Sequence, residues 1–311
     1  MSESILVIAD NAGGANLVAG WCAENGENQF EFCVSDSAVT LFGEILGDFE
    51  NHPIADLEEL LGTVDRVVCG TSENSEVVHR TILLARQLGV PSVTFLDHWF
   101  GYRRRFYDSD SELKDLPDEI WVTDEYAKNQ AVLEGFPESL ISLQGSPYIE
   151  QIARAAQELG AGVSTDQKGI LFLSEPIANV SELTGAPLED VGFDEYQLVE
   201  DVIFAVGSSG NLKLILRLHP SEPADQYNAL LNKISGNMNV VVSNECDLAV
   251  DLARATAVVG SNSTALVVSV EAGLPTFSYI PESGRACVLP HDTIVKVRSR
   301  SVLSESLRDL A

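Results

Sequence analysis

The sequence predicts an α/β protein made of two doubly wound domains, each with a parallel sheet between layers of helices. Short apolar runs of strand length alternate with amphipathic stretches of helix length through the whole chain. This order is typical of parallel sheets that are covered on both faces. The length of 311 residues exceeds what one hydrophobic core usually supports, so we expect two domains.

The first half starts with an apolar strand at Ile5–Ala9 and closes with a helix over 145–156. Further strands are predicted at Gln29–Val34, Arg66–Cys69, Ser92–Leu96, Glu119–Val122 and Ile141–Leu143. Helices between them are predicted over 15–24, 38–46, 75–88 and 125–134. A polar, Gly-rich stretch at 158–168 is the best linker candidate, which gives domains of 1–157 and 158–311.

The second half repeats the alternation after a strand at Ile170–Leu173. Its other strands are predicted at Lys213–Leu218, Val240–Val242, Ala257–Val259 and Thr276–Tyr279. Its helices are predicted over 195–206, 224–234, 247–253 and 265–272, with a long loop or lid at 176–193. A terminal helix is expected over 302–310. This helix could pack back on the first domain.

The charge balance is strongly acidic, with 47 Asp and Glu against 19 Lys and Arg and a formal net charge of -28. Such a surface repels nucleic acid, so we expect no nucleic-acid partner. Five cysteines without CxxC spacing indicate reduced thiols, and no apolar run is long enough to span a membrane. The chain begins as a first strand and not as a signal peptide, so we expect a cytoplasmic protein.

The segment VGSNSTALVVSVEAGLP over 259–275 carries the firmest functional signal. Ser261, Ser263 and Thr264 lie between a strand and a helix, where free backbone N–H groups and hydroxyls favour a phosphate or diphosphate. The structural alternative is that these residues only cap the N-terminus of the helix. Glu271, further along the helix, is a candidate for a ribose hydroxyl.

The segment LRLHP over 216–220 ends a neighbouring strand. Arg217 and His219 could supply positive charge to the same anion. The alternative for His219 is a structural or capping role. Together with the Ser-rich loop, these residues indicate a nucleotide-sugar pocket.

A Gly-rich loop, DNAGGAN over 10–16, follows the first strand. Gly13 and Gly14 would let the backbone approach a ligand closely, and Asn16 is a further binding candidate. The loop is not GxGxxG, and no acidic residue ends the second strand at dinucleotide spacing, which disfavours NAD. A tight strand-to-helix turn is the structural alternative.

Asp97 and His98 end another strand of the first half, in FLDHWFGYRRRF over 95–106. A carboxylate or imidazole there could act as general base on a hydroxyl. The alternative is a structural contact between the two side chains. The basic run Arg103–Arg105 suits a substrate anion or salt bridges to the acidic stretch Asp108–Asp118.

At the level of these motifs the chain resembles the GT-B class of glycosyltransferases and their sugar-nucleotide 2-epimerase relatives. The resemblance rests on the Gly-rich first loop, the GSP motif at Gly145–Pro147 and the GSNST…EAGLP segment. The pair His219–Pro220 with a later Ser-rich loop is similar to bacterial sialyltransferases and glycerophosphate-polymer transferases. The resemblance implies two Rossmann-like domains and a nucleotide-sugar held by the second of them.

From this resemblance we expect a metal-independent glycosyltransferase of surface-polysaccharide or glycoconjugate synthesis, with no cofactor. A nucleotide-sugar donor and a sugar or lipid-linked acceptor would be its partners. Asp97 or His98 would be the base, with Gly13 and Gly14 near the transferring sugar and Asn16 among the residues that bind the nucleotide-sugar. Two alternatives stay open: a sugar-nucleotide epimerase or hydrolase, and a non-catalytic binding protein of the same fold.

Overall fold

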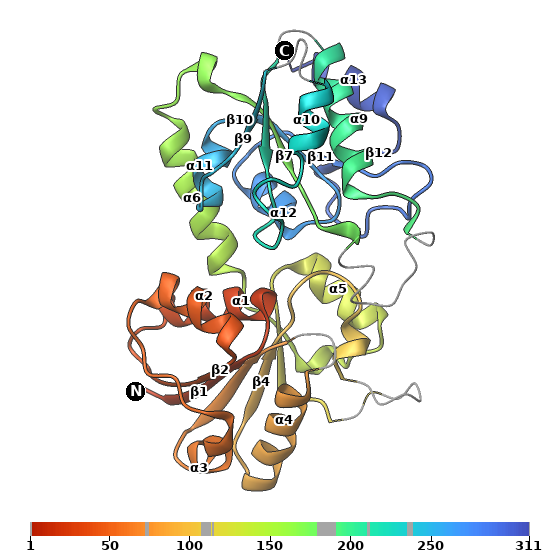
Figure 1. The fold of residues 1–311 in the computed structure, drawn as a ribbon. Helices are drawn as coiled ribbons and strands as arrows, with labels where there is room; N and C mark the ends of the chain where they lie inside the picture. Colours follow the sequence, from red (N-terminus) through yellow and green to blue (C-terminus); the bar gives the residue numbers. More distant parts are fainter. Residues whose placement is uncertain are drawn as a thin grey trace. The chain divides into compact units, whose positions relative to one another are not determined.

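A computed structural model of the chain describes residues 2–71, 75–106, 113, 115–178, 191–209, 212–234 and 239–310. The chain divides into two compact units, Met1–Tyr148 and Ile149–Ala311 (Figure 1). Each unit contains one six-stranded sheet. The boundary expected at residue 157 lies within helix α6, Pro147–Gly160.

The first sheet has the strand order β2-β1-β3-β4-β5-β6, and every pairing in it is parallel. Its strands are β1 Ser4–Ala9, β2 Gln29–Val34, β3 Arg66–Gly70, β4 Ser92–Phe95, β5 Glu119–Val122 and β6 Ile141–Leu143. The helices between them are α1 Ala12–Glu24, α2 Asp36–Leu46, α3 Leu57–Leu61, α4 Glu76–Leu88 and α5 Glu125–Leu133.

Both faces of this sheet are covered, which explains why its strands are apolar without alternation. On one face, α1 and α2 bury residues such as Val18 and Phe42 against Val7 and Phe32 of the strands. On the other face, α4 buries Ile82. Ordered N-caps start the helices, with Asn11 accepting from the Gly14 amide and Ser75 from the Val78 amide.

The second sheet has the order β12-β11-β10-β7-β8-β9 and is also parallel throughout. Its strands are β7 Gly169–Leu173, β8 Leu214–Arg217, β9 Val240–Val242, β10 Ala255–Gly260, β11 Thr276–Tyr279 and β12 Ile294–Val297. Its further helices are α9 Glu195–Ser208, α10 Asn228–Ile234, α11 Leu248–Ala253, α12 Thr264–Glu271 and α13 Arg300–Arg308.

The C-terminal helix α13 packs in the core of the second unit. The sequence left open whether this helix packs on the first domain. Leu303 and Leu307 are fully buried in a cluster with Val202 and Val206 of α9. The Ser209 hydroxyl also donates to the Ser304 carbonyl at 2.7 Å. The sequence shows the apolar stripe of this helix, but a stripe alone does not name the surface that it covers.

The predicted fold class, two Rossmann-like α/β domains, is confirmed. The sequence did not predict α3 or the strand β12. Helix α3 has only five residues, and β12 buries only its two end residues, so neither produces a clear periodicity. Most of the loop expected at 176–193 lies outside the described residues.

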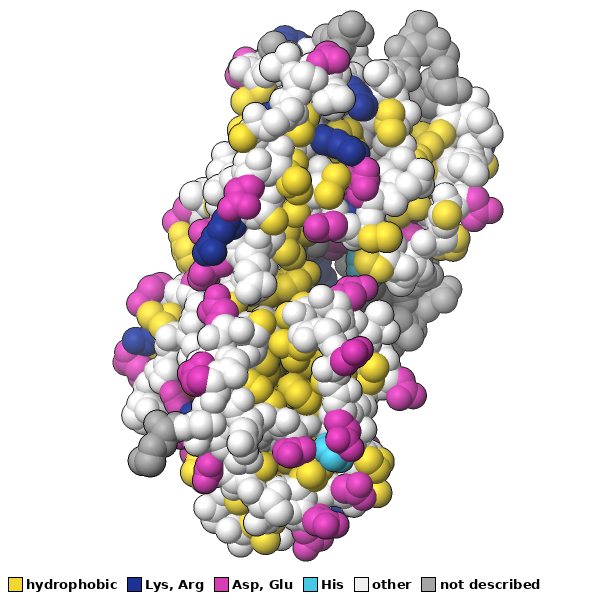
Figure 2. All heavy atoms as spheres, turned by 90° about the vertical axis from the view of Figure 1, so that its left-hand side faces the viewer, with side chains coloured by type: hydrophobic (Ala, Val, Ile, Leu, Met, Phe, Trp, Pro, Cys, Tyr) yellow, Lys and Arg dark blue, Asp and Glu magenta, His cyan; other side chains and the backbone are white. Residues whose placement is uncertain are grey.

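The surface reflects the acidic composition. Figure 2 shows acidic side chains scattered over one face with few basic ones between them, as expected for a net charge of -28. Among the described residues, no helix combines the length and apolarity needed to cross a membrane.

Helix α13 provides a test of the second core. Leu303→Ala removes a fully buried side chain and should lower the free energy of unfolding by about 2–5 kcal/mol. Val302 on the same helix is 50% exposed, so Val302→Ala should stay within about 0.5 kcal/mol. Urea unfolding followed by circular dichroism measures both, and equal losses would contradict this packing.

Candidate functional site

The sheet order of the first unit places a topological switch point between β1 and β3, where ligands of doubly wound folds bind. Polar side chains follow both strands. The Asp10 carboxylate, after β1, accepts a hydrogen bond from the Ser75 hydroxyl at the start of α4. Thr71, after β3, donates its hydroxyl to the Phe95 carbonyl at the end of β4.

Asp97 follows β4 and is only 6% exposed. Its Oδ1 forms an ion pair with Arg105, which is equally buried and also donates to the Thr71 hydroxyl at 3.1 Å. Arg105 therefore turns inward to Asp97. The sequence also offered the acidic stretch Asp108–Asp118 as a partner for the basic run. Six residues of that stretch, 108–112 and 114, lie outside the described residues.

His98 is the accessible member of this group, with 37% of its side chain exposed. Its Nε2 lies 3.7 Å from Asp97 Oδ2. Its backbone has φ of 58°, a left-handed conformation that costs a non-glycine residue about 1–3 kcal/mol and is found disproportionately at functional sites. The imidazole thus meets solvent while a buried carboxylate lies behind it.

The loop around His98 is fixed by several hydrogen bonds. The Tyr102 hydroxyl donates to the His98 carbonyl at 2.5 Å, and Trp99 Nε1 donates to Asp124 at 2.7 Å. The Glu134 carboxylate accepts from the backbone amides of Gly101 and Arg103 at 3.1 and 2.8 Å. These contacts hold the strained residue in place.

The two glycines of the first loop are needed by the protein's own packing. A Cβ on Gly13 would overlap the Asp97 carboxylate, and one on Gly14 would lie 2.7 Å from the Gly70 carbonyl carbon. The start of α1 therefore lies against the ends of β3 and β4. Within the described residues, Asn16 Oδ1 is buried and accepts no hydrogen bond.

In the second unit the switch point lies between β7 and β10, and the Ser-rich loop follows β10. The backbone amides of Ser261 and Asn262 point at one oxygen, Glu175 Oε1, at 3.0 and 2.9 Å. The Ser261 hydroxyl donates to the same oxygen at 2.5 Å. A carboxylate thus occupies a three-donor anion site of the kind that the sequence predicts for phosphate.

The two other hydroxyls of this loop sit at the start of α12. Ser263 is the N-cap and accepts from the Ala265 amide at 3.2 Å, which is the capping role weighed above. Thr264 is the first residue of the helix. Glu271 is its last residue, about 10 Å further along the axis, and is exposed. The structure therefore does not bring Glu271 to the loop.

His219 is exposed, and its orientation is set by its own loop. Nδ1 lies 3.2 Å from the Ser221 amide, which donates to it, and 2.8 Å from the Ser221 hydroxyl. An Nδ1 that accepts leaves the ring proton of the neutral imidazole on Nε2, which faces away from these partners. His219 is thus prepared to donate a hydrogen bond to a ligand.

A buried carboxylate, Glu222, fixes this loop to the end of β7. It accepts from the His219 amide at 2.7 Å, the Ser174 hydroxyl at 2.8 Å and the Tyr227 hydroxyl at 2.7 Å. Burial, with Glu222 adding to it, raises the pKa of Tyr227, so this hydroxyl stays protonated and continues to donate. Sequence reasoning missed Glu175 and Glu222, although each follows a predicted strand within five residues.

Arg217 lies elsewhere than expected. Its Nη1 pairs with the fully buried Asp251 at 2.6 Å, and its guanidinium also donates to the carbonyls of Glu245 and Cys246. Arg217 therefore anchors the loop after β9 to α11. Of the two residues predicted next to the anion, His219 is the exposed one, and Arg217 is partly buried by its own partners.

The buried pair of the first unit gives a direct prediction. Asp97→Asn removes the buried negative charge that pairs with Arg105 and should cost about 3–5 kcal/mol of stability. The exposed pair Lys128–Glu138 is the control, because Glu138→Gln should cost no more than about 1 kcal/mol. Chemical denaturation compares the two, and a similar small loss for both would contradict a buried Asp97–Arg105 pair.

Comparison with solved structures shows the fold of this chain. No protein-family model and no curated protein matches the sequence. Among solved structures, the UDP-GlcNAc 2-epimerase from Methanocaldococcus jannaschii is similar with a TM-score of 0.67 and 13% identity. That match covers 98% of this chain and 91% of that one.

Two further solved structures show the same architecture. Anabaena Alr3699/HepE in complex with UDP and glucose has a TM-score of 0.66 at 9% identity, covering 99% of this chain and 89% of that one. UDP-GlcNAc 2-epimerase from Neisseria meningitidis, bound to UDP-GlcNAc, has a TM-score of 0.61 at 12% identity, with 99% and 91% covered. The chain therefore has the GT-B-like fold of these nucleotide-sugar-binding proteins.

Proposed function

We propose that this chain is an enzyme acting on a nucleotide-activated sugar, of the epimerase or hydrolase type. The observation that carries the proposal is the convergence of three donors from Ser261 and Asn262 on one anionic oxygen at a switch point. Solved structures of similar fold that hold UDP or UDP-GlcNAc support a nucleoside diphosphate as the ligand. The UDP-GlcNAc 2-epimerases among these structures favour an epimerase-type reaction over the glycosyl transfer expected from the sequence.

In this proposal the second unit holds the diphosphate. The amides and hydroxyl of the Ser-rich loop bind one phosphate oxygen in place of Glu175, and the α12 N-terminus adds its dipole. His219 Nε2 donates to a second phosphate oxygen. Charge that develops on the leaving diphosphate is then stabilised by donors already in position.

The acid–base step is assigned to the first unit. His98 is its exposed candidate for the acid–base group, and Asp97 is a positioning residue that orients the imidazole from behind. Arg105 pairs with the Asp97 carboxylate in its buried position. The left-handed backbone conformation of His98 is strained, and such strain is found disproportionately at functional sites.

A binding experiment tests the diphosphate site. UDP and UDP-sugars should raise the melting temperature more than CMP-, GDP- and dTDP-sugars do. At a hundredfold excess of ligand over Kd, binding adds about 2.7 kcal/mol to the free energy of unfolding. His219→Ala should reduce that shift, whereas Lys233→Ala, at an exposed position of α10, should not. A well-folded protein that shifts with none of these nucleotides would rule out the proposal.

Turnover then separates the reaction types. Release of nucleoside diphosphate or a change of sugar stereochemistry without an acceptor supports the epimerase or hydrolase. Turnover only with an added sugar acceptor would restore the transferase. Binding with no turnover, unchanged in His98→Ala, would indicate a non-catalytic binding protein.

Glu175 gives a second prediction, since a diphosphate must displace its carboxylate from the Ser-rich loop. Glu175→Gln keeps the side-chain size but removes the competing charge, so UDP should bind about tenfold more tightly. Glu200→Gln, an exposed carboxylate on α9, is the control for net charge. Calorimetric titration measures both, and weaker binding in Glu175→Gln would show that Glu175 is itself a ligand-binding residue.

A further inference from the structure

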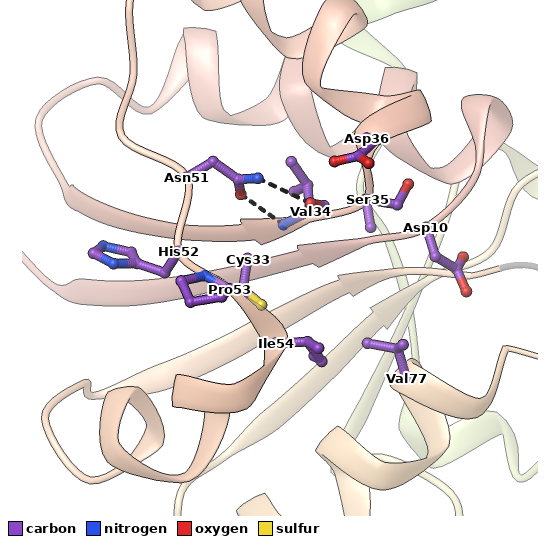
Figure 3. Close-up of a pocket in the computed structure, with 11 residues that line it drawn as sticks. Asp10, Cys33, Val34, Ser35, Asp36, Asn51, His52, Pro53, Ile54 and Val77 are labelled. Carbon is purple, nitrogen blue, oxygen red and sulfur yellow. Dashed lines mark hydrogen bonds between the residues drawn. The ribbon is translucent and has the colours of Figure 1, made fainter.

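A cavity of about 480 Å³ opens in the first unit, separate from Asp97 and His98 (Figure 3). It lies at the carboxyl ends of β1 and β2, beside the segment before α3 and the first turn of α4. Its size falls within the range of small-molecule sites, and its position is the edge where parallel sheets bind ligands.

The wall of the cavity is built rigidly. Asn51 pairs with β2 through both ends of its amide, accepting from the Val34 amide at 2.9 Å and donating to the Val34 carbonyl at 3.0 Å. Figure 3 shows these two bonds, with the His52 ring pointing away from the other lining residues. His52 instead lies 2.8 Å from Glu31. Asn51 and His52 therefore form the wall and are not ligand contacts.

The inner surface is apolar. Ile54 and Val77 face one another across the cavity in Figure 3, and Cys33 lies beside them. Burial, with the charge of Asp56 adding to it, raises the pKa of the Cys33 thiol, so it stays neutral. Ile54 is 39% exposed, an apolar surface that a ligand ring would cover.

The carboxylates that line the cavity are hydrogen-bond acceptors only. Asp10, Ser35 and Asp36 line it, and among its described lining residues none is Lys or Arg. Asp36 is in the first turn of α2 and already provides the negative charge that this helix end favours. An anionic ligand is therefore disfavoured, whereas a ligand that donates hydrogen bonds to carboxylates is favoured.

From this combination we propose that the cavity binds a neutral, hydroxyl-rich ring, either a sugar or the ribose of a nucleoside. Its C–H face packs on Ile54 and Val77, and its hydroxyls donate to the carboxylates of Asp36 and Asp10. This site is additional to the nucleotide site of the second unit and does not rest on it.

The experiment is ligand-observed NMR and calorimetry on the full chain with glucose, N-acetylglucosamine, uridine and adenosine. At least one neutral ligand should bind, roughly tenfold more weakly to Asp36→Asn, the loss expected for a charge-assisted hydrogen bond. Val77→Phe should abolish binding by filling the cavity. The controls Asp48→Asn and Val132→Phe, at exposed positions that do not line it, should leave binding unchanged.

The four ligands show whether the cavity binds a saccharide or a nucleoside, and a second-unit variant shows which unit binds it. Binding of sugars alone indicates a saccharide, and binding of nucleosides alone indicates a nucleoside. His219→Ala should change neither, because that residue belongs to the second unit. The proposal fails if no neutral ligand binds, if binding survives in folded Val77→Phe, or if inorganic phosphate or Mg²⁺ binds there instead.

Discussion

Parallel pairing throughout both sheets is the constraint that decides where polar chemistry can lie in this protein. Parallel strands need a crossover after each strand, and the crossovers cover both faces with helices. The apolar faces are thereby closed, and the loops after the strands gather at the carboxyl edge of each sheet. Asp97, Glu175, His219 and Ser261 all follow the end of a strand for this reason.

The second consequence concerns charge. In a chain with a net charge of -28, two arginines at the carboxyl edges are held by buried aspartates, Arg105 by Asp97 and Arg217 by Asp251. Burial of an arginine requires such a partner, because an unpaired charge inside a protein is costly. An anion at the second edge would therefore be bound mainly by the amides of Ser261 and Asn262 and by the imidazole of His219. Such donors bind a phosphate without a matching positive surface.

Much of the fold could be read from the sequence, because continuous apolar strands and amphipathic helices leave a clear periodicity. The positions of Asp97, His219 and the Ser-rich loop at strand ends follow from the same pattern. What the pattern does not contain is the partner of each side chain. Arg217 looks available for an anion in the sequence, yet Asp251, thirty-four residues later, takes its guanidinium. Gly13 and Gly14 look like ligand contacts, yet their missing Cβ atoms admit Asp97 and Gly70. Such contacts depend on tertiary packing between segments distant in the chain.

Hydrogen–deuterium exchange with and without UDP tests the diphosphate site of the second unit, because it reports which backbone segments a ligand protects. We expect added protection in peptides that cover 216–222 and 259–268 of the second unit. Protection that is absent from both segments, although UDP is bound, would contradict the assignment of the diphosphate to the Ser261–Asn262 amides.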